Sequence, residues 1–92
     1  MIKIAIVEDD RNHCRQLEQY LKQYEEEYHT DFDISVFHDG DGILQQGKTQ
    51  FDIILLDIQM PLVDGITTAR EIRSNDSKVI IIFVTTVAQY AI

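Results

Sequence analysis

The sequence has a single cysteine, no long apolar run and no signal-peptide pattern at its start. Its single cysteine, Cys14, excludes an intramolecular disulfide and is consistent with a reducing compartment. No apolar run approaches the roughly 20 residues that a membrane helix needs. The opening residues "MIKIAIVEDD" reach acidic side chains too early for a signal peptide. We therefore expect a cytoplasmic location and no membrane partner.

Basic residues are also scarce. There are 8 lysines and arginines against 16 acidic residues, and the formal net charge is -8. A surface of this sign repels nucleic acid, so we expect this segment not to bind DNA by itself. The 92 residues, 45% of them hydrophobic, suit one globular domain with a modest core.

Short apolar runs and amphipathic stretches alternate along the chain. The runs that are typical of buried strands cover residues 2–7, 32–37, 51–57 and 78–86. Helices are expected over residues 11–28, over residues 41–46, and after Asp64, which can cap a third helix. Alternation of this kind predicts an α/β fold with a parallel sheet.

The helix patterns predict which side chains face the sheet. The inner face of the first long helix is expected to carry Cys14, Leu17, Leu21, Tyr24 and Tyr28. The inner face of the third is expected to carry Ile66, Ala69 and Ile72. Cys14 is therefore interpreted as a core residue, and the three histidines, which show no ligand spacing, as surface or boundary residues.

Acidic and hydroxyl side chains lie at the carboxyl ends of the predicted strands. In open parallel α/β sheets, ligand-binding sites form outside these strand ends. Glu8 and Asp9 follow the first strand, Asp57 ends the third, and Thr85 lies at the end of the fourth. Neighbouring carboxylates repel one another, and a divalent cation resolves the conflict. Oxygen ligands without clustered Cys or His favour Mg²⁺. One carboxylate is then available as a nucleophile toward a phosphoryl group.

Three motifs, in order, resemble the receiver domain of two-component response regulators. They are "VEDD" after the first strand, "LLDIQMPLVDG", and "IFVTT" at the fourth strand. The most specific piece is D-x-x-M-P-x-x-D-G over residues 57–65. The resemblance implies a flavodoxin-like, doubly wound parallel sheet of order 2-1-3-4. It also implies a receiver domain over residues 1–92 that lacks the fifth strand and last helix, and is thus incomplete at its C-terminus.

The resemblance further implies a role for individual residues. Asp57 would be the phosphoacceptor, receiving its phosphoryl group from a sensor histidine kinase in the presence of Mg²⁺. The metal would be held by Asp9 and Asp57, by Glu8 mostly through water, and by the main-chain carbonyl of Gln59. Thr85 would be the switch hydroxyl. On this interpretation the chain is a signalling switch and not an enzyme.

The C-terminal part of the sequence bears on three properties: the DNA-binding domain that the receiver would control, the strength of its switching, and its association with a second copy. "VED" and the tail "TTVAQYAI" are most similar to regulators with a LytTR-type DNA-binding domain, so transcription would be controlled through a C-terminal domain absent here. The lysine and the aromatic residue that receivers carry at the fifth strand are absent as well, so weaker phosphorylation and switching are expected. An unpaired fourth strand predicts a homodimer.

Two other functions compete with the switch. One is a Mg²⁺-dependent phosphatase or phosphotransferase with an aspartyl intermediate, which would need a substrate pocket and a second general acid. The other is an interaction module that never receives phosphate, which a missing Asp57 or acid pair would favour. Incubation with acetyl phosphate and Mg²⁺ distinguishes the three hypotheses. A switch would show a stable mass gain, an enzyme would show catalytic turnover, and an interaction module would show no change.

Overall fold

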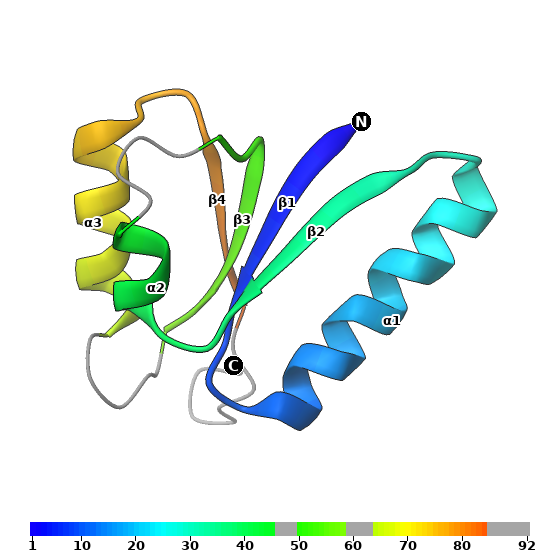
Figure 1. Cartoon of the computed structure of the whole chain (residues 1–92), viewed down its shortest axis with the longest axis horizontal. Helices are drawn as coiled ribbons and strands as arrows, with labels where there is room; N and C mark the ends of the chain where they lie inside the picture. The colour runs from blue at the N-terminus through cyan, green and yellow to red at the C-terminus, as the bar shows by residue number, and fades with distance from the viewer. Residues whose placement is uncertain (46–49, 59–63, 85–92) are drawn as a thin grey trace, which may run out of the picture.

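The computed structural model describes residues 1–45, 50–58 and 64–84. Four parallel strands form one sheet in the order β2-β1-β3-β4 (Figure 1). Along the chain the elements are β1 (Ile2–Val7), α1 (Arg11–Tyr28), β2 (Phe32–Phe37), α2 (Gly40–Leu44), β3 (Ile53–Asp57), α3 (Gly65–Asn75) and β4 (Ile80–Val84). The strand order confirms the predicted doubly wound parallel sheet of order 2-1-3-4.

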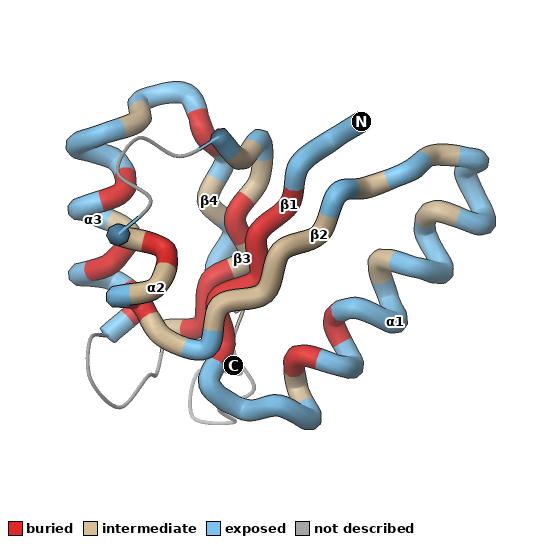
Figure 2. The backbone as a smooth tube through the Cα atoms, in the orientation of Figure 1, coloured by how far each residue is buried: buried red, intermediate tan, exposed pale blue. Residues whose placement is uncertain are grey.

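Helices cover both faces of the sheet. In Figure 1, α1 lies on one side, and α2 and α3 lie on the other. Successive residues of a strand point to opposite faces, so β1 and β3 contribute to two separate cores. Figure 2 shows these two central strands as the most buried part of the backbone. Within the described residues, no helix combines the length and hydropathy needed to cross a lipid bilayer.

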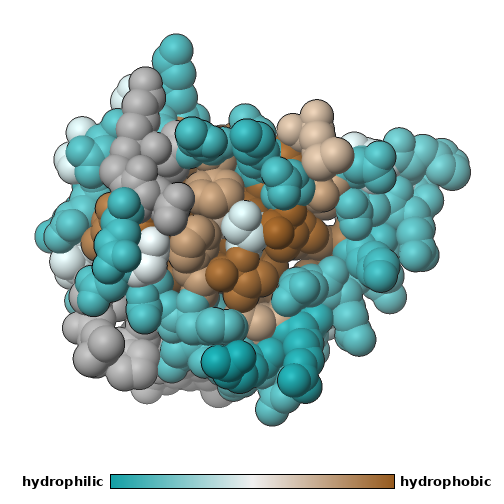
Figure 3. All heavy atoms as spheres, viewed as in Figure 1, coloured by the Kyte–Doolittle hydropathy of each residue, from teal (hydrophilic) through white to brown (hydrophobic). Residues whose placement is uncertain are grey.

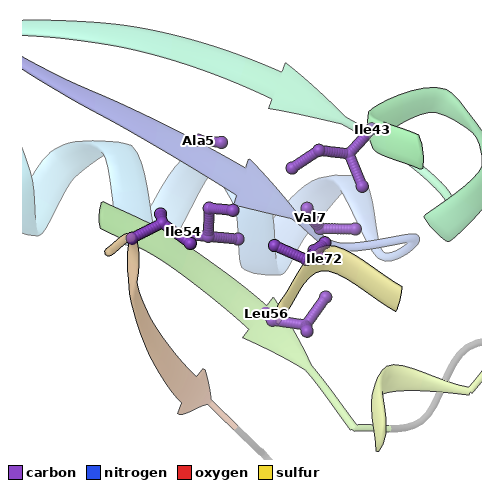
Figure 4. Packing of buried hydrophobic residues seen from close by; sticks show 7 residues of the cluster. Ala5, Val7, Ile43, Ile54, Leu56 and Ile72 are labelled. Atoms are coloured by element: carbon purple, nitrogen blue, oxygen red, sulfur yellow. The ribbon is translucent and has the colours of Figure 1, made fainter. Parts of the chain in front are cut away.

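The core on the α2–α3 face is the larger one. Figure 4 shows side chains from β1, β3, α2 and α3 converging there. Its fully or almost fully buried members are Ala5, Val7, Ile43, Ile54, Leu56, Ile72 and Val79. On the opposite face, Ile6 packs with Cys14 and Leu17 of α1. The interpretation of Cys14 as a core residue is confirmed, since only 3% of its surface is exposed.

The helices follow the predicted periodicity with exceptions at their ends. Ile66 is 41% exposed, whereas Thr68 is completely buried, so the prediction for Ile66 is wrong. Gly65, Thr68 and Ile72 form the buried face of α3, and Ile66 lies to one side of that face. Tyr24 and Tyr28, expected on the inner face of α1, are 49% and 61% exposed.

Both tyrosines border an apolar groove between α1 and the sheet. The groove has a volume of about 470 Å³, and its sheet wall includes Ile4, Leu55 and Ile82. The remaining lining residues are Ile2, Leu21, Thr30, Phe32 and Ile53. The two tyrosines therefore face the sheet side but remain accessible. Figure 3 shows hydrophobic residues gathered in the middle of the visible face, with hydrophilic residues over α1.

Candidate functional site

The site lies at the carboxyl ends of β1 and β3, which are hydrogen-bonded neighbours. Val7 is in register with Leu56, so Glu8 and Asp57, the residues that follow them, reach the same edge of the sheet. Carboxylate oxygens of Glu8, Asp9 and Asp57 all lie within 4.8 Å of one another. Glu8 and Asp57 are buried, and Asp9 is exposed. Three acidic side chains thus converge on one point that solvent reaches from the Asp9 side.

A helix cap carries the chain from β1 into α1. The Asp10 carboxylate accepts hydrogen bonds from the main-chain N–H groups of Asn12 (2.9 Å) and His13 (3.3 Å). This is the usual role of an N-cap aspartate, because those N–H groups have no partner within the helix. The cap starts α1 immediately after the acidic pair, so Glu8 and Asp9 stay at the strand end.

A glycine allows α3 to begin against the end of β3. The main-chain N–H of Gly65 donates to the Ile58 carbonyl oxygen at 2.8 Å. A β-carbon at residue 65 would collide with the main-chain oxygen of Asp57 and would lie 2.7 Å from the Ile58 α-carbon. Only glycine permits this approach. Main-chain packing therefore holds the strand end that carries Asp57.

Asp64 caps α3, as the sequence predicts. Its carboxylate accepts hydrogen bonds from the main-chain N–H of Thr67 (2.8 Å) and from the Thr67 hydroxyl (3.1 Å). The hydrogen bond from the Thr67 main chain is the main reason that the pKa of Asp64 lies below its ordinary value. Asp64 is therefore occupied with the helix and is not one of the three clustered acids.

Burial makes ionisation of Glu8 unfavourable. The pKa of Glu8 is raised from 4.5 to about 7, mainly by burial and also by the nearby charge of Asp57, against the lowering effect of hydrogen bonds from His13 and Asp10. Burial, followed by the charge of Glu8, also raises the pKa of Cys14 to about 11. The thiol thus stays protonated at neutral pH, while Glu8 is poised between its two forms.

The structure places some of the predicted site residues and adds two others. Glu8, Asp9 and Asp57 come together as expected, whereas Gln59 and Thr85 lie outside the described residues. The sequence interpretation missed His13 and His38, which both contact Glu8. Only the position of His13, in the first turn of the helix that follows Glu8, could have indicated its contact.

A parallel sheet of order 2-1-3-4, with acids at the carboxyl ends of β1 and β3, defines a doubly wound α/β protein with a strand-end acidic site. The family described as "Response regulator receiver domain" matches residues 4–92. The chain therefore belongs to this family and is the receiver domain of a response regulator in a two-component system.

Individual relatives agree with this assignment. The response regulator ArlR of Staphylococcus saprophyticus is 36% identical over 83 residues, which is 89% of this chain and 35% of ArlR. The chain thus spans about a third of the length of that curated relative. The LytTR-type output domain stays a prediction.

Two solved structures share the fold. One is the Thermotoga maritima response regulator TrrA in complex with Mg²⁺ and BeF, with a TM-score of 0.82 and 27% identity over 99% of this chain and 75% of TrrA. The other is the complex of histidine kinase ThkA with TrrA. The TM-score is 0.79, and the identity is 27% over 100% of this chain and 75% of the matched chain in that complex.

Proposed function

We propose that this receiver domain accepts a phosphoryl group on Asp57 from a sensor histidine kinase, with Mg²⁺ bound at Glu8, Asp9 and Asp57. The observation that carries the proposal is the convergence of these three carboxylates within 4.8 Å at the ends of two adjacent parallel strands. The TrrA structures support it, because one holds Mg²⁺ and BeF and another holds a histidine kinase.

The donor set fits magnesium. All three side chains offer carboxylate oxygens, which are hard ligands, and Mg²⁺ typically uses one or two carboxylates and keeps several waters. Asp9 and Asp57 would ligate directly, with Glu8 mostly through water, and Gln59 would add its main-chain carbonyl. When bound, Mg²⁺ would neutralise the clustered negative charge and stabilise the charge of a phosphoryl group.

Asp57 is the residue best placed to accept the phosphoryl group. It ends a buried strand whose position is held by main-chain contacts at Gly65, so its carboxylate is presented rigidly. A carboxylate oxygen attacks phosphorus, the bond from phosphorus to the donor histidine nitrogen breaks, and its electron pair returns to that nitrogen. The product is an acyl phosphate. Thr85 would then donate its hydroxyl to the phosphoryl group as the switch.

We expect Mg²⁺ to raise the melting temperature of the wild-type protein. Binding relieves repulsion among three acids and stabilises the folded state by mass action. Millimolar-scale Mg²⁺ should contribute about 1 kcal/mol, or a few degrees for a domain of this size. Thermal melts monitored by circular dichroism, with and without Mg²⁺, measure the shift.

Asp9→Ala is the matched variant for this measurement. Asp9 is exposed, so its truncation leaves the core intact while removing one ligand. The variant should lose most of the Mg²⁺-dependent shift. An equal shift in Asp9→Ala, or none in the wild type, would contradict the proposed metal site.

Self-association through β4 is proposed as well. In the described part of the chain, β4 is paired only with β3, and Ile80, Ile82 and Phe83 are 55%, 45% and 43% exposed. Such an edge can pair with that of a second copy, which would give a symmetric dimer. Light scattering over a dilution series should show a concentration-dependent dimer. A monodisperse monomer at high micromolar concentration, with a cooperative melt, would overturn this proposal.

The output of the whole protein is a separate proposal. The sequence favours transcriptional control through a LytTR-type DNA-binding domain, while the acidic receiver itself contributes no DNA contact. DNA binding by the full-length regulator, measured with and without phosphorylation, would test it. Phosphorylation-independent binding through some other kind of domain would contradict it.

A further inference from the structure

Two histidines outside the predicted site hold Glu8 in place. His13 lies in the first turns of α1, and His38 follows the end of β2. One contacts the side chain of Glu8, and the other contacts its main chain. Glu8 is thus fixed by contacts from two elements that flank β1, in addition to its own strand.

Both oxygens of the Glu8 carboxylate are engaged. Oε2 lies 2.8 Å from Nδ1 of His13, and Oε1 accepts from the main-chain N–H of Asp10 at 3.2 Å. The contact with His13 is well shielded, since the two side chains are 11% and 3% exposed. A hydrogen bond to an ionised carboxylate in such a setting is about twice as strong as one between neutral groups. The carboxylate therefore has one preferred orientation.

The main chain of Glu8 is held in the same way. Its N–H donates to the Phe37 carbonyl at 2.9 Å, and its own carbonyl oxygen accepts from Nδ1 of His38 at 3.1 Å and from the Cys14 thiol at 3.4 Å. Because a carbonyl oxygen only accepts, Nδ1 of His38 carries the hydrogen. The backbone at the end of β1 is thereby fixed to β2 and to α1.

We propose that His13 is a positioning residue for the magnesium site. Its Nδ1–H donates to Oε2 of Glu8 and keeps the free lone pairs of that carboxylate directed toward Asp9 and Asp57. Each carboxylate oxygen has two lone pairs, so the hydrogen bond and a metal-bound water do not compete. Groups that orient ligands in this way typically change metal affinity by 10- to 100-fold. This inference rests on the proposed function.

Substitutions at residue 13 separate the donor from the rest of the side chain. His13→Leu removes the donor and keeps an apolar bulk, and His13→Asn places an amide nitrogen near the position of Nδ1. Titration calorimetry with Mg²⁺ alone should show a roughly tenfold weaker affinity for His13→Leu and recovery of most of the affinity for His13→Asn. His13→Ala provides a second variant without the donor, in case the leucine variant folds poorly. Alanine has the highest helix propensity, so it is compatible with α1.

Matched controls come from the same helix. Gln19 is exposed on α1, so Gln19→Leu should leave the affinity unchanged. His29 ends α1 with φ of 51°, a conformation that asparagine tolerates, so His29→Asn should also have no effect. Both control positions lie away from the acidic cluster. The controls introduce the same two residues, leucine and asparagine, as the test substitutions at residue 13.

The outcomes distinguish this inference from the function on which it depends. Weaker Mg²⁺ binding in the donor-free variants, with recovery in His13→Asn, supports the positioning role. Unchanged affinity in His13→Leu and His13→Ala overturns it, even if their melting temperatures fall, because His13 would then only stabilise the fold. Equal Mg²⁺ binding by wild type and Asp9→Ala overturns the metal site itself, and the inference with it.

Discussion

Asp57→Asn should abolish phosphorylation of this protein and leave its fold intact. Asparagine has the shape of aspartate but no nucleophilic carboxylate oxygen, and the buried end of β3 can accept it without a change in volume. Mass spectrometry after incubation with acetyl phosphate and Mg²⁺ is the measurement. The wild type should gain the mass of a phosphoryl group, and the variant should not.

The same experiment includes its own controls. Asp33 is exposed on β2, so Asp33→Asn should be phosphorylated like the wild type. A comparable mass gain in Asp57→Asn would show that another residue is the acceptor. Steady release of phosphate by the wild type, without a lasting mass gain, would favour the phosphatase hypothesis. No reaction in the wild type would favour a module that works without phosphate.

The metal-free wild-type protein should lose stability as the pH rises from about 4.5 to about 7. The pKa of Glu8 is 4.5 ordinarily and about 7 in the folded state. Between these values the folded protein binds more protons than the unfolded chain, so the free energy of unfolding falls with increasing pH. The full effect, present above pH 7, is roughly 3 kcal/mol. Chemical denaturation at a series of pH values measures it.

Glu8→Gln isolates this contribution. Other acids, including Asp9 and Asp57, remain in both proteins, so the difference between the two curves reports mainly on Glu8. The variant should become more stable relative to the wild type as the pH rises through this range. Because His13 contacts the Glu8 carboxylate, the comparison is repeated in a His13→Asn background. Parallel curves for wild type and Glu8→Gln in both backgrounds would contradict the prediction.

The order of the sheet and the position of the acidic cluster were predictable from sequence. Apolar runs mark the strands, and acidic residues directly after two of them must meet if those strands are parallel neighbours. The resemblance to receiver domains supplied that neighbour relation, and β1 and β3 do pair. Asp64 was also predictable as a cap, because capping depends on residues only two or three positions away.

Contacts that depend on tertiary geometry were not predictable in the same way. The contact of His38 with Glu8 joins residues 30 positions apart, and it requires β2 to end beside the end of β1. Helical periodicity likewise places Tyr24 on the sheet side of α1, but it does not tell how closely that turn approaches the sheet. The groove leaves this side chain 49% exposed.

The absence of a side chain at Gly65 has a consequence for how this domain tolerates sequence change. The N–H of Gly65 and the carbonyl of Ile58 form a main-chain contact, and the oxygen of Asp57 occupies the space that a β-carbon would need. The geometry of the strand end is thus set by atoms that every amino acid has in common. Any substitution that adds a β-carbon at residue 65 would therefore displace the main chain that carries the carboxylate, whatever the chemistry of the new side chain.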